Sequence, residues 1–119
     1  GCEEVGTMLG CASVIVMDEK ADIVKQVRRM VDFYAHESCG QCTPCREGSS
    51  WTAQILKRIE YGRGTEEDLN TLMEMTQQMV GTTICVLSDS VAAPVQSSIE
   101  KFREDYLSLI RRDEQIGAA

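Results

Sequence analysis

Three cysteines are crowded into one short segment of the sequence, HESCGQCTPCREG at residues 36–48. Cys39, Cys42 and Cys45 follow one another at three-residue intervals, and a fourth cysteine, Cys85, stands well apart from them. Two thiols separated by two residues can form a redox disulfide, but a third thiol at the same interval has no local partner left. The spacing therefore favours shared ligation of a metal centre.

Four thiolates bind either a tetrahedral zinc ion or an iron-sulfur cluster. Zinc sites usually take their ligands as two separate CxxC pairs, whereas CxxCxxC with a remote fourth cysteine is typical of a 4Fe-4S site. The pattern predicts one 4Fe-4S cluster on Cys39, Cys42, Cys45 and Cys85, with a structural zinc module for assembly as the alternative. A disulfide framework is less favoured, because the sequence shows no secretory signal.

The residues between the cysteines suit a loop that enters a helix. Gly40 allows a turn between the first two ligands, and Pro44 fixes the turn before Cys45. Cys45 is expected in the first helical turn, where free backbone N–H groups and the positive end of the helix dipole stabilise an anionic cluster. Arg46 adds a nearby cation.

Other residues could be given chemical roles, but simpler interpretations are favoured. His36, the only histidine, could approach the cluster, although a residue that closes the first helix explains it as well. Glu37 and Glu47 could form an acid-base pair, but solvated charge is the simpler explanation. The sequence has no Ser-His-Asp arrangement, P-loop or GxGxxG motif, so we assign no catalytic residue.

Four predicted helices would position these cysteines. Capping and breaking residues place them from Asp22 to about Ser38, from Thr43 to Gly62, from Thr65 to Gly81, and from about 92 to 112. In the last of them Val95, Ile99, Phe102, Tyr106 and Leu109 form the apolar stripe, and Trp51 is expected in the core from the second. Short loops favour antiparallel neighbours, which predicts a mainly α fold, a small antiparallel four-helix bundle.

This topology would place the two cysteine-bearing loops together. In an up-down-up-down bundle, the connection between the first two helices and the connection between the last two lie at the same end. The first carries the cysteine triplet and the second carries Cys85. We therefore expect the four thiolates to converge.

The N-terminal part of the chain follows a different pattern. SVIVMD at residues 13–18 is apolar and rich in β-branched side chains, which predicts a buried strand. A lone strand cannot satisfy its backbone hydrogen bonds. We therefore expect the chain to be a fragment of a longer polypeptide whose partner strands lie upstream.

Composition excludes several classes of function. The 119 residues carry a net charge of −7, which argues against a surface that binds nucleic acid. No apolar run approaches the roughly 18 residues of a membrane span, so no direct membrane insertion is expected. Apolar residues at 43% and charged residues at 26% predict an ordinary globular domain rather than a disordered chain.

The string ESCGQCTPCREG, followed by TTIC and APVQSSIEKF, resembles the C-terminal domain of the NADH- and FMN-binding flavoprotein subunit of complex I, NADH:quinone oxidoreductase. LGCASVIVMDEKADIV resembles the segment that leads into that domain. The resemblance covers nearly the whole chain. The same module is found in the diaphorase subunits of NAD-linked hydrogenases and formate dehydrogenases, which the motif does not separate from complex I.

The resemblance implies a place in an electron-transfer chain. In the family, NADH reduces FMN, and a 4Fe-4S cluster whose ligands match Cys39, Cys42, Cys45 and Cys85 passes single electrons to iron-sulfur subunits on the way to quinone. The family's FMN/NADH-binding domain lies upstream of this region. The chain is thus expected to be part of an NADH dehydrogenase (quinone) and to be inactive alone.

The resemblance also implies a domain organisation and a location. Residues 1–20 would be the tail of an upstream ubiquitin-like domain and a linker, residues 21–112 the iron-sulfur domain, and residues 113–119 a frayed tail. The whole subunit would lie peripheral to a membrane complex, on the cytoplasmic or mitochondrial matrix side.

Overall fold

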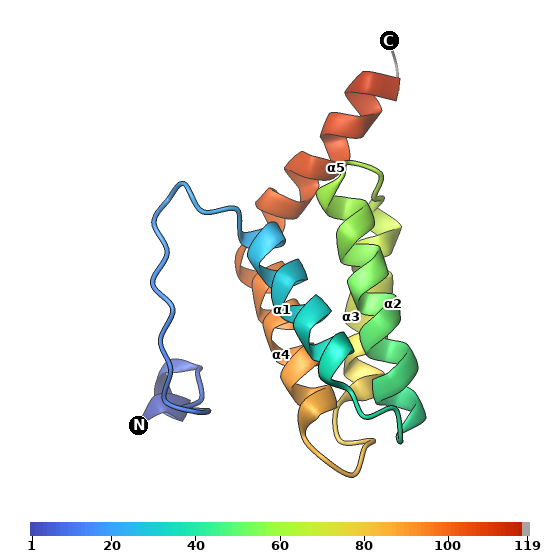
Figure 1. Cartoon of the computed structure of the whole chain (residues 1–119). Coiled ribbons are helices and arrows are strands. Elements are labelled where there is room, and N and C mark those ends of the chain that lie inside the picture. Colours follow the sequence, from blue (N-terminus) through green and yellow to red (C-terminus); the bar gives the residue numbers. More distant parts are fainter. Residues whose placement is uncertain (118–119) are drawn as a thin grey trace.

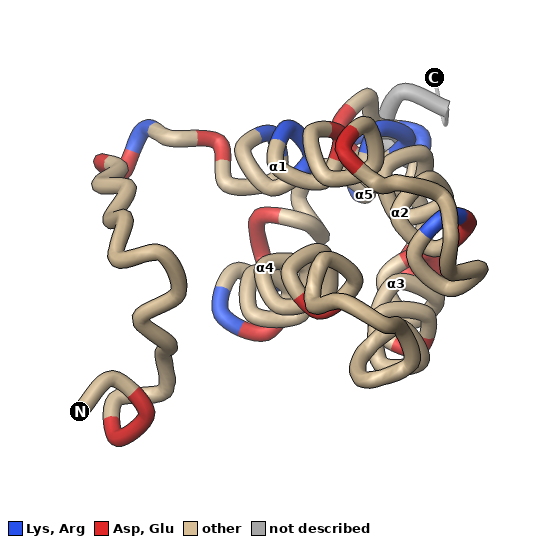
Figure 2. Tube along the Cα trace, turned by 60° about the horizontal axis from the view of Figure 1, so that its bottom comes forward, with Lys and Arg blue, Asp and Glu red and all other residues tan. Residues whose placement is uncertain are grey.

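The computed structural model describes the backbone of residues 1–117 and the side chains of residues 1–112. Within this part the chain is all-helical, with five α-helices and no strand. The elements are η1 (Cys2–Val5), α1 (Ile23–Glu37), α2 (Thr43–Glu60), α3 (Glu66–Met79), α4 (Leu87–Lys101) and α5 (Arg103–Gly117). The first four α-helices run side by side as a bundle, and α5 extends beyond one end of it (Figure 1). Viewed obliquely toward the opposite end, they surround a common centre (Figure 2).

Local capping fixes where the helices begin. The Asp22 side chain accepts a 3.1 Å hydrogen bond from the backbone N–H of Lys25 and caps α1. Thr65 and Asp68 form the predicted capping box, in which each side chain accepts a hydrogen bond from the other residue's backbone N–H. The predicted starts of these two helices are confirmed. At α2 the cap is Cys42, one residue earlier than predicted.

The core lies where the apolar faces of all five helices meet. The contacting helix pairs include α1 with α2, α2 with α3, α3 with α4, and α4 with α1, which closes the ring. Fully or almost fully buried side chains come from every helix: Val24, Val31, Leu56, Ile59, Leu69, Leu72, Met79, Val91, Val95, Ile99, Tyr106 and Ile110. This core holds the ends of the helices, and therefore the loops between them, in fixed relative positions.

Trp51 is not in the core, contrary to the prediction, and its exposed fraction is 53%. Near its N-terminus α2 instead buries small residues, among them Gly48, Ser49 and Thr52. The hydroxyl groups of Ser49 and Thr52 donate to backbone carbonyl oxygens one turn earlier, so neither is left unpaired. Small side chains let neighbouring elements approach this face closely, which leaves Trp51 on the outer side.

The predicted single last helix is two helices. Its backbone breaks at Phe102, where φ is −124° and ψ is 36°, and α5 starts at the next residue. The break changes the helical phase, so Phe102 is 44% exposed, whereas Tyr106, Leu107 and Ile110 are buried. The four-helix prediction is corrected to five helices.

The beginning of α4 is also earlier than predicted, at Leu87, so that Pro94 lies inside the helix. Contacts with the end of α3 place this first turn. The Ser88 hydroxyl donates to the carbonyl oxygen of Met79 at 3.0 Å, and Asp89 accepts from the backbone N–H of Gly81 at 2.9 Å. These contacts join residues eight and nine positions apart and depend on the packing of α3 beside α4.

The predicted strand at residues 13–18 is wrong. This segment has no regular secondary structure and stands away from the bundle (Figure 1). Val14 and Val16 are 85% and 89% exposed. Among the described residues there is no second strand with which its backbone could pair, so water takes up those hydrogen bonds.

The predicted frayed tail at residues 113–119 falls partly outside the described residues. The backbone of α5 continues to Gly117, and residues 118 and 119 are not described. Within the described part of the chain, none of the helices combines the length and apolar character that crossing a membrane requires.

Candidate metal centre

Two loops at one end of the bundle carry the four predicted ligands. Residues 38–42 connect α1 to α2, and residues 80–86 connect α3 to α4 (Figure 1). Cys39 and Cys42 lie in the first loop, Cys45 in the first turn of α2, and Cys85 in the second loop. The structure thus has the loop arrangement that the up-down-up-down topology predicts.

The four sulfurs differ in exposure. Cys45 is buried, with 7% of its surface exposed, whereas Cys42 is half-buried and Cys39 and Cys85 are exposed. All four are free thiols in the described structure. Cys45 is therefore anchored in the protein, and the other three lie closer to solvent.

The structure brings the loops to one end but does not gather the sulfurs around one point. Among the described residues, no group of three or more His, Cys, Asp or Glu side chains is arranged to hold a single metal ion. In a 4Fe-4S cluster each thiolate binds a different iron, so the four sulfurs surround the cluster instead of meeting at one atom. Four free thiols on two loops at one end fit this donor set.

Arg46 holds the first loop against α2. Its Nη1 donates a 2.6 Å hydrogen bond to the carbonyl oxygen of Gly40, and its Nη2 donates to Thr43 Oγ1 at 3.4 Å. Gly40 has a φ of +79°, a conformation that glycine adopts readily, as expected for the turn between the first two ligands. The sequence indicated Arg46 only as a nearby charge, and its loop contact became visible only in the structure.

Ser38 is a residue of the site that the sequence analysis missed. Its Oγ lies 3.3 Å from Cys45 Sγ and accepts a 3.3 Å hydrogen bond from the backbone N–H of Gly40. The only sequence signal is a serine between the end of the first helix and Cys39. Nothing in that position indicates a contact with a cysteine seven residues later.

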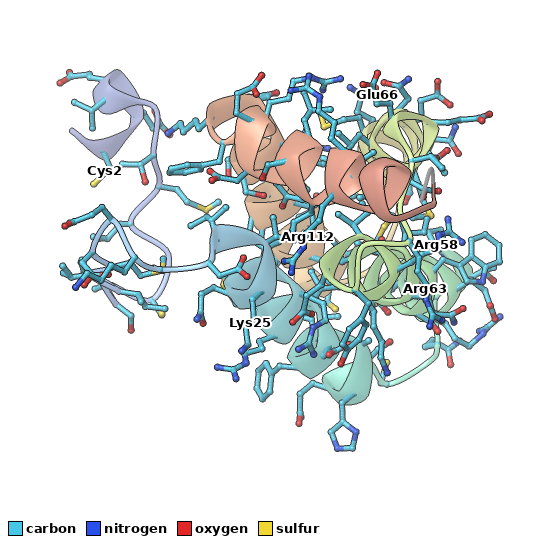
Figure 3. All side chains as sticks on the ribbon, turned by 90° about the horizontal axis from the view of Figure 1, so that it is seen from above. Cys2, Lys25, Arg58, Arg63, Glu66 and Arg112 are labelled. Atoms are coloured by element: carbon cyan, nitrogen blue, oxygen red, sulfur yellow. The ribbon has the colours of Figure 1, made fainter. Side chains whose placement is uncertain are left out.

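The remaining sequence candidates lie outside this arrangement. His36 is exposed in the last turn of α1, where the simpler interpretation placed it. Glu47 forms a 3.2 Å ion pair with Arg46, as a surface carboxylate does. Cys2 lies on the N-terminal segment, to the side of the helices (Figure 3), and Cys11 is exposed on the same segment.

The fold and the site together define a class, a helical domain with a thiolate ligand set on two loops at one end. The chain matches the family model described as the NADH-ubiquinone oxidoreductase-F iron-sulfur binding region, over residues 25–109. It belongs to this family and carries its 4Fe-4S-binding region. The expected family membership and cofactor are thereby confirmed.

Named relatives agree with this assignment. The chain is 51% identical over 104 residues to the mitochondrial NADH-ubiquinone oxidoreductase 51 kDa subunit of Neurospora crassa, a match that covers 87% of this chain and 21% of the relative. It is 45% identical over 108 residues to an NADH-quinone oxidoreductase subunit of Mycobacterium tuberculosis, with 91% and 24% covered. The chain therefore spans about a fifth to a quarter of the length of these enzyme subunits.

A solved structure shares the fold. A chain in the crystal structure of an NAD+-reducing [NiFe]-hydrogenase in the H2-reduced state superposes with a TM-score of 0.75 at 35% sequence identity. The match covers 80% of this chain and 16% of that chain.

Proposed function

We propose that this chain is an electron-relay domain that holds one 4Fe-4S cluster on Cys39, Cys42, Cys45 and Cys85. The observation that carries the proposal is the location of these four free thiols on two loops at one end of the bundle. Membership of an iron-sulfur binding family supports it. When bound, such a cluster accepts and donates single electrons.

The residues around the ligands prepare the site for an anionic group. Cys45 lies in the first turn of α2, where backbone N–H groups without helical partners and the positive end of the helix dipole face the ligand side. Arg46 brings a positive charge to the same turn while it holds the loop at Gly40. Both features stabilise the negative charge that four thiolates bring together.

We further propose the donor and the acceptor by analogy with the named relatives. Electrons would come from NADH through FMN, in an FMN/NADH-binding domain of the same or a longer chain. They would leave through iron-sulfur subunits of a multisubunit complex toward quinone. Relatives named as subunits of NADH-quinone oxidoreductase, one of them mitochondrial, support a position peripheral to a membrane complex, on the cytoplasmic or matrix side.

A second candidate function is the same relay in an NAD-linked hydrogenase or formate dehydrogenase diaphorase subunit. The fold match to the NAD+-reducing hydrogenase favours this candidate. The two functions use the same cluster and differ in the electron acceptor. Assays of the native complex with quinone and with a hydrogenase acceptor would separate them.

Anaerobic reconstitution of the chain with iron and sulfide tests the proposal. We expect about four iron and four sulfide per chain, and visible absorbance that bleaches on reduction. A colourless chain that binds one zinc with the same four cysteines would overturn the relay function and support the structural zinc module.

A further inference from the structure

Ser38 is fixed in place at the end of α1 by contacts on both sides. As the C-cap of this helix it donates its backbone N–H to the carbonyl oxygen of Tyr34 at 3.0 Å. Its side-chain oxygen accepts from the N–H of Gly40 and lies 3.3 Å from Cys45 Sγ. The hydroxyl group is therefore held between the loop and the candidate ligand.

The direction of the contact between Ser38 and Cys45 follows from their chemistry. A cysteine that binds iron is a thiolate and has no proton to donate. The Ser38 oxygen already accepts a hydrogen bond from Gly40, and its own proton remains free to point at the sulfur. In the metal-loaded protein Ser38 must therefore be the donor and Cys45 the acceptor.

This contact distinguishes Cys45 from the other three ligands. Among the described residues, Cys45 is the only one of the four whose sulfur has a hydrogen-bond partner. Cys45 is also the most buried of them. A hydrogen bond in a buried environment is electrostatically stronger than the same bond in water.

We propose that Ser38 is a positioning residue that donates a hydrogen bond to the Cys45 thiolate and raises the reduction potential of the cluster. The proposal rests on the proposed function, because it requires Cys45 to be a ligand. One-electron reduction adds negative charge that the ligand sulfurs share, so a donor to one of these sulfurs stabilises the reduced state. Removing the donor makes reduction less favourable.

A redox titration of the reconstituted chain, followed by the electron paramagnetic resonance signal of the reduced cluster, tests this inference. Ser38→Ala should lower the midpoint potential with the iron content unchanged. Ser38→Thr keeps the hydroxyl group and should restore a potential close to that of the wild type. Ser97→Ala removes an exposed hydroxyl group on α4 and should leave the potential unchanged.

Each other outcome counts against the inference in a recognisable way. An unchanged potential in Ser38→Ala with a full cluster would overturn it and leave the proposed function intact. Loss of the cluster in both Ser38 variants, with helical circular dichroism retained, would also overturn it and assign Ser38 to assembly. A wild-type chain that takes up no iron would overturn the proposed function itself.

Discussion

Arg46 donates a 2.6 Å hydrogen bond from its guanidinium group to the carbonyl oxygen of Gly40, six residues earlier. This bond ties the loop that carries Cys39 and Cys42 to the first turn of α2, where Cys45 lies. The relative positions of three of the four proposed ligands therefore depend on one side chain.

Replacing Arg46 with alanine should make cluster binding less stable. A hydrogen bond with a charged partner contributes about 1.5–3 kcal/mol, and partial exposure of Arg46 reduces this value. We expect the cluster of Arg46→Ala to be lost roughly three to ten times faster in the presence of a chelator, measured by the decay of visible absorbance. Lys101→Ala, an exposed change on α4, is the control. Equal decay rates in both variants would contradict the role of Arg46.

The six cysteines should fall into two groups when replaced singly. Variants of the four proposed ligands should lose the intact cluster, because one iron would lack its thiolate. Cys2→Ser and Cys11→Ser should retain a full complement of iron, since both residues are exposed on the N-terminal segment. Iron and sulfide analysis after anaerobic reconstitution measures the difference. Full loading of Cys85→Ala would remove Cys85 from the ligand set.

Gly64 lies directly against Ile59, and an alanine there should destabilise the bundle. A Cβ atom at position 64 would come within 2.5 Å of Ile59 Cγ1 and 2.9 Å of Ile59 Cα, which belongs to the backbone. Because Ile59 is completely buried, it has little room to move. We expect Gly64→Ala to lower the free energy of unfolding by about 1–3 kcal/mol in urea denaturation. The exposed neighbour variant Arg63→Ala should change it little.

Tyr106 should make stability fall at alkaline pH. Burial raises the pKa of its phenol from 10.0 to about 12, and its hydroxyl group forms a 2.7 Å hydrogen bond with Ser98. The stability that this shift contributes is fully present below pH 10.0. Between pH 10.0 and about 12 the unfolded chain ionises its tyrosine while the folded chain does not, so stability is lost.

A comparison of the wild type with Tyr106→Phe isolates this effect, since the other titrating groups are common to both. The slope should be about 1.4 kcal/mol per pH unit in that range in the wild type relative to the variant. Urea denaturation followed by circular dichroism at several pH values measures it. Parallel stability curves for the two proteins would contradict the raised pKa.

Much of the fold was predictable, because helix starts are encoded locally. The caps at Asp22 and Thr65 are formed with residues three positions away, so the sequence alone contains both partners. The break at Phe102 was not predictable from periodicity, because the apolar stripe continues through it. There the packing of α5 on the bundle outweighs the local pattern.

The candidate site divides in the same way. The cysteine spacing indicated the ligand set, since three ligands within seven residues form a local pattern. The exposure of Trp51 depends instead on how closely neighbouring elements approach the small residues of α2, which no local pattern encodes.

The sequence by itself determined the chemistry that is available here, namely the thiolate set and the helices whose ends carry it. Only the tertiary structure decided that Cys45 is buried, that Ser38 reaches its sulfur, and that Arg46 holds the loop. The physical reason is the range of the interactions. Residue type and spacing act along the chain, whereas burial and hydrogen bonds between a loop and a helix arise when packing brings separate segments together.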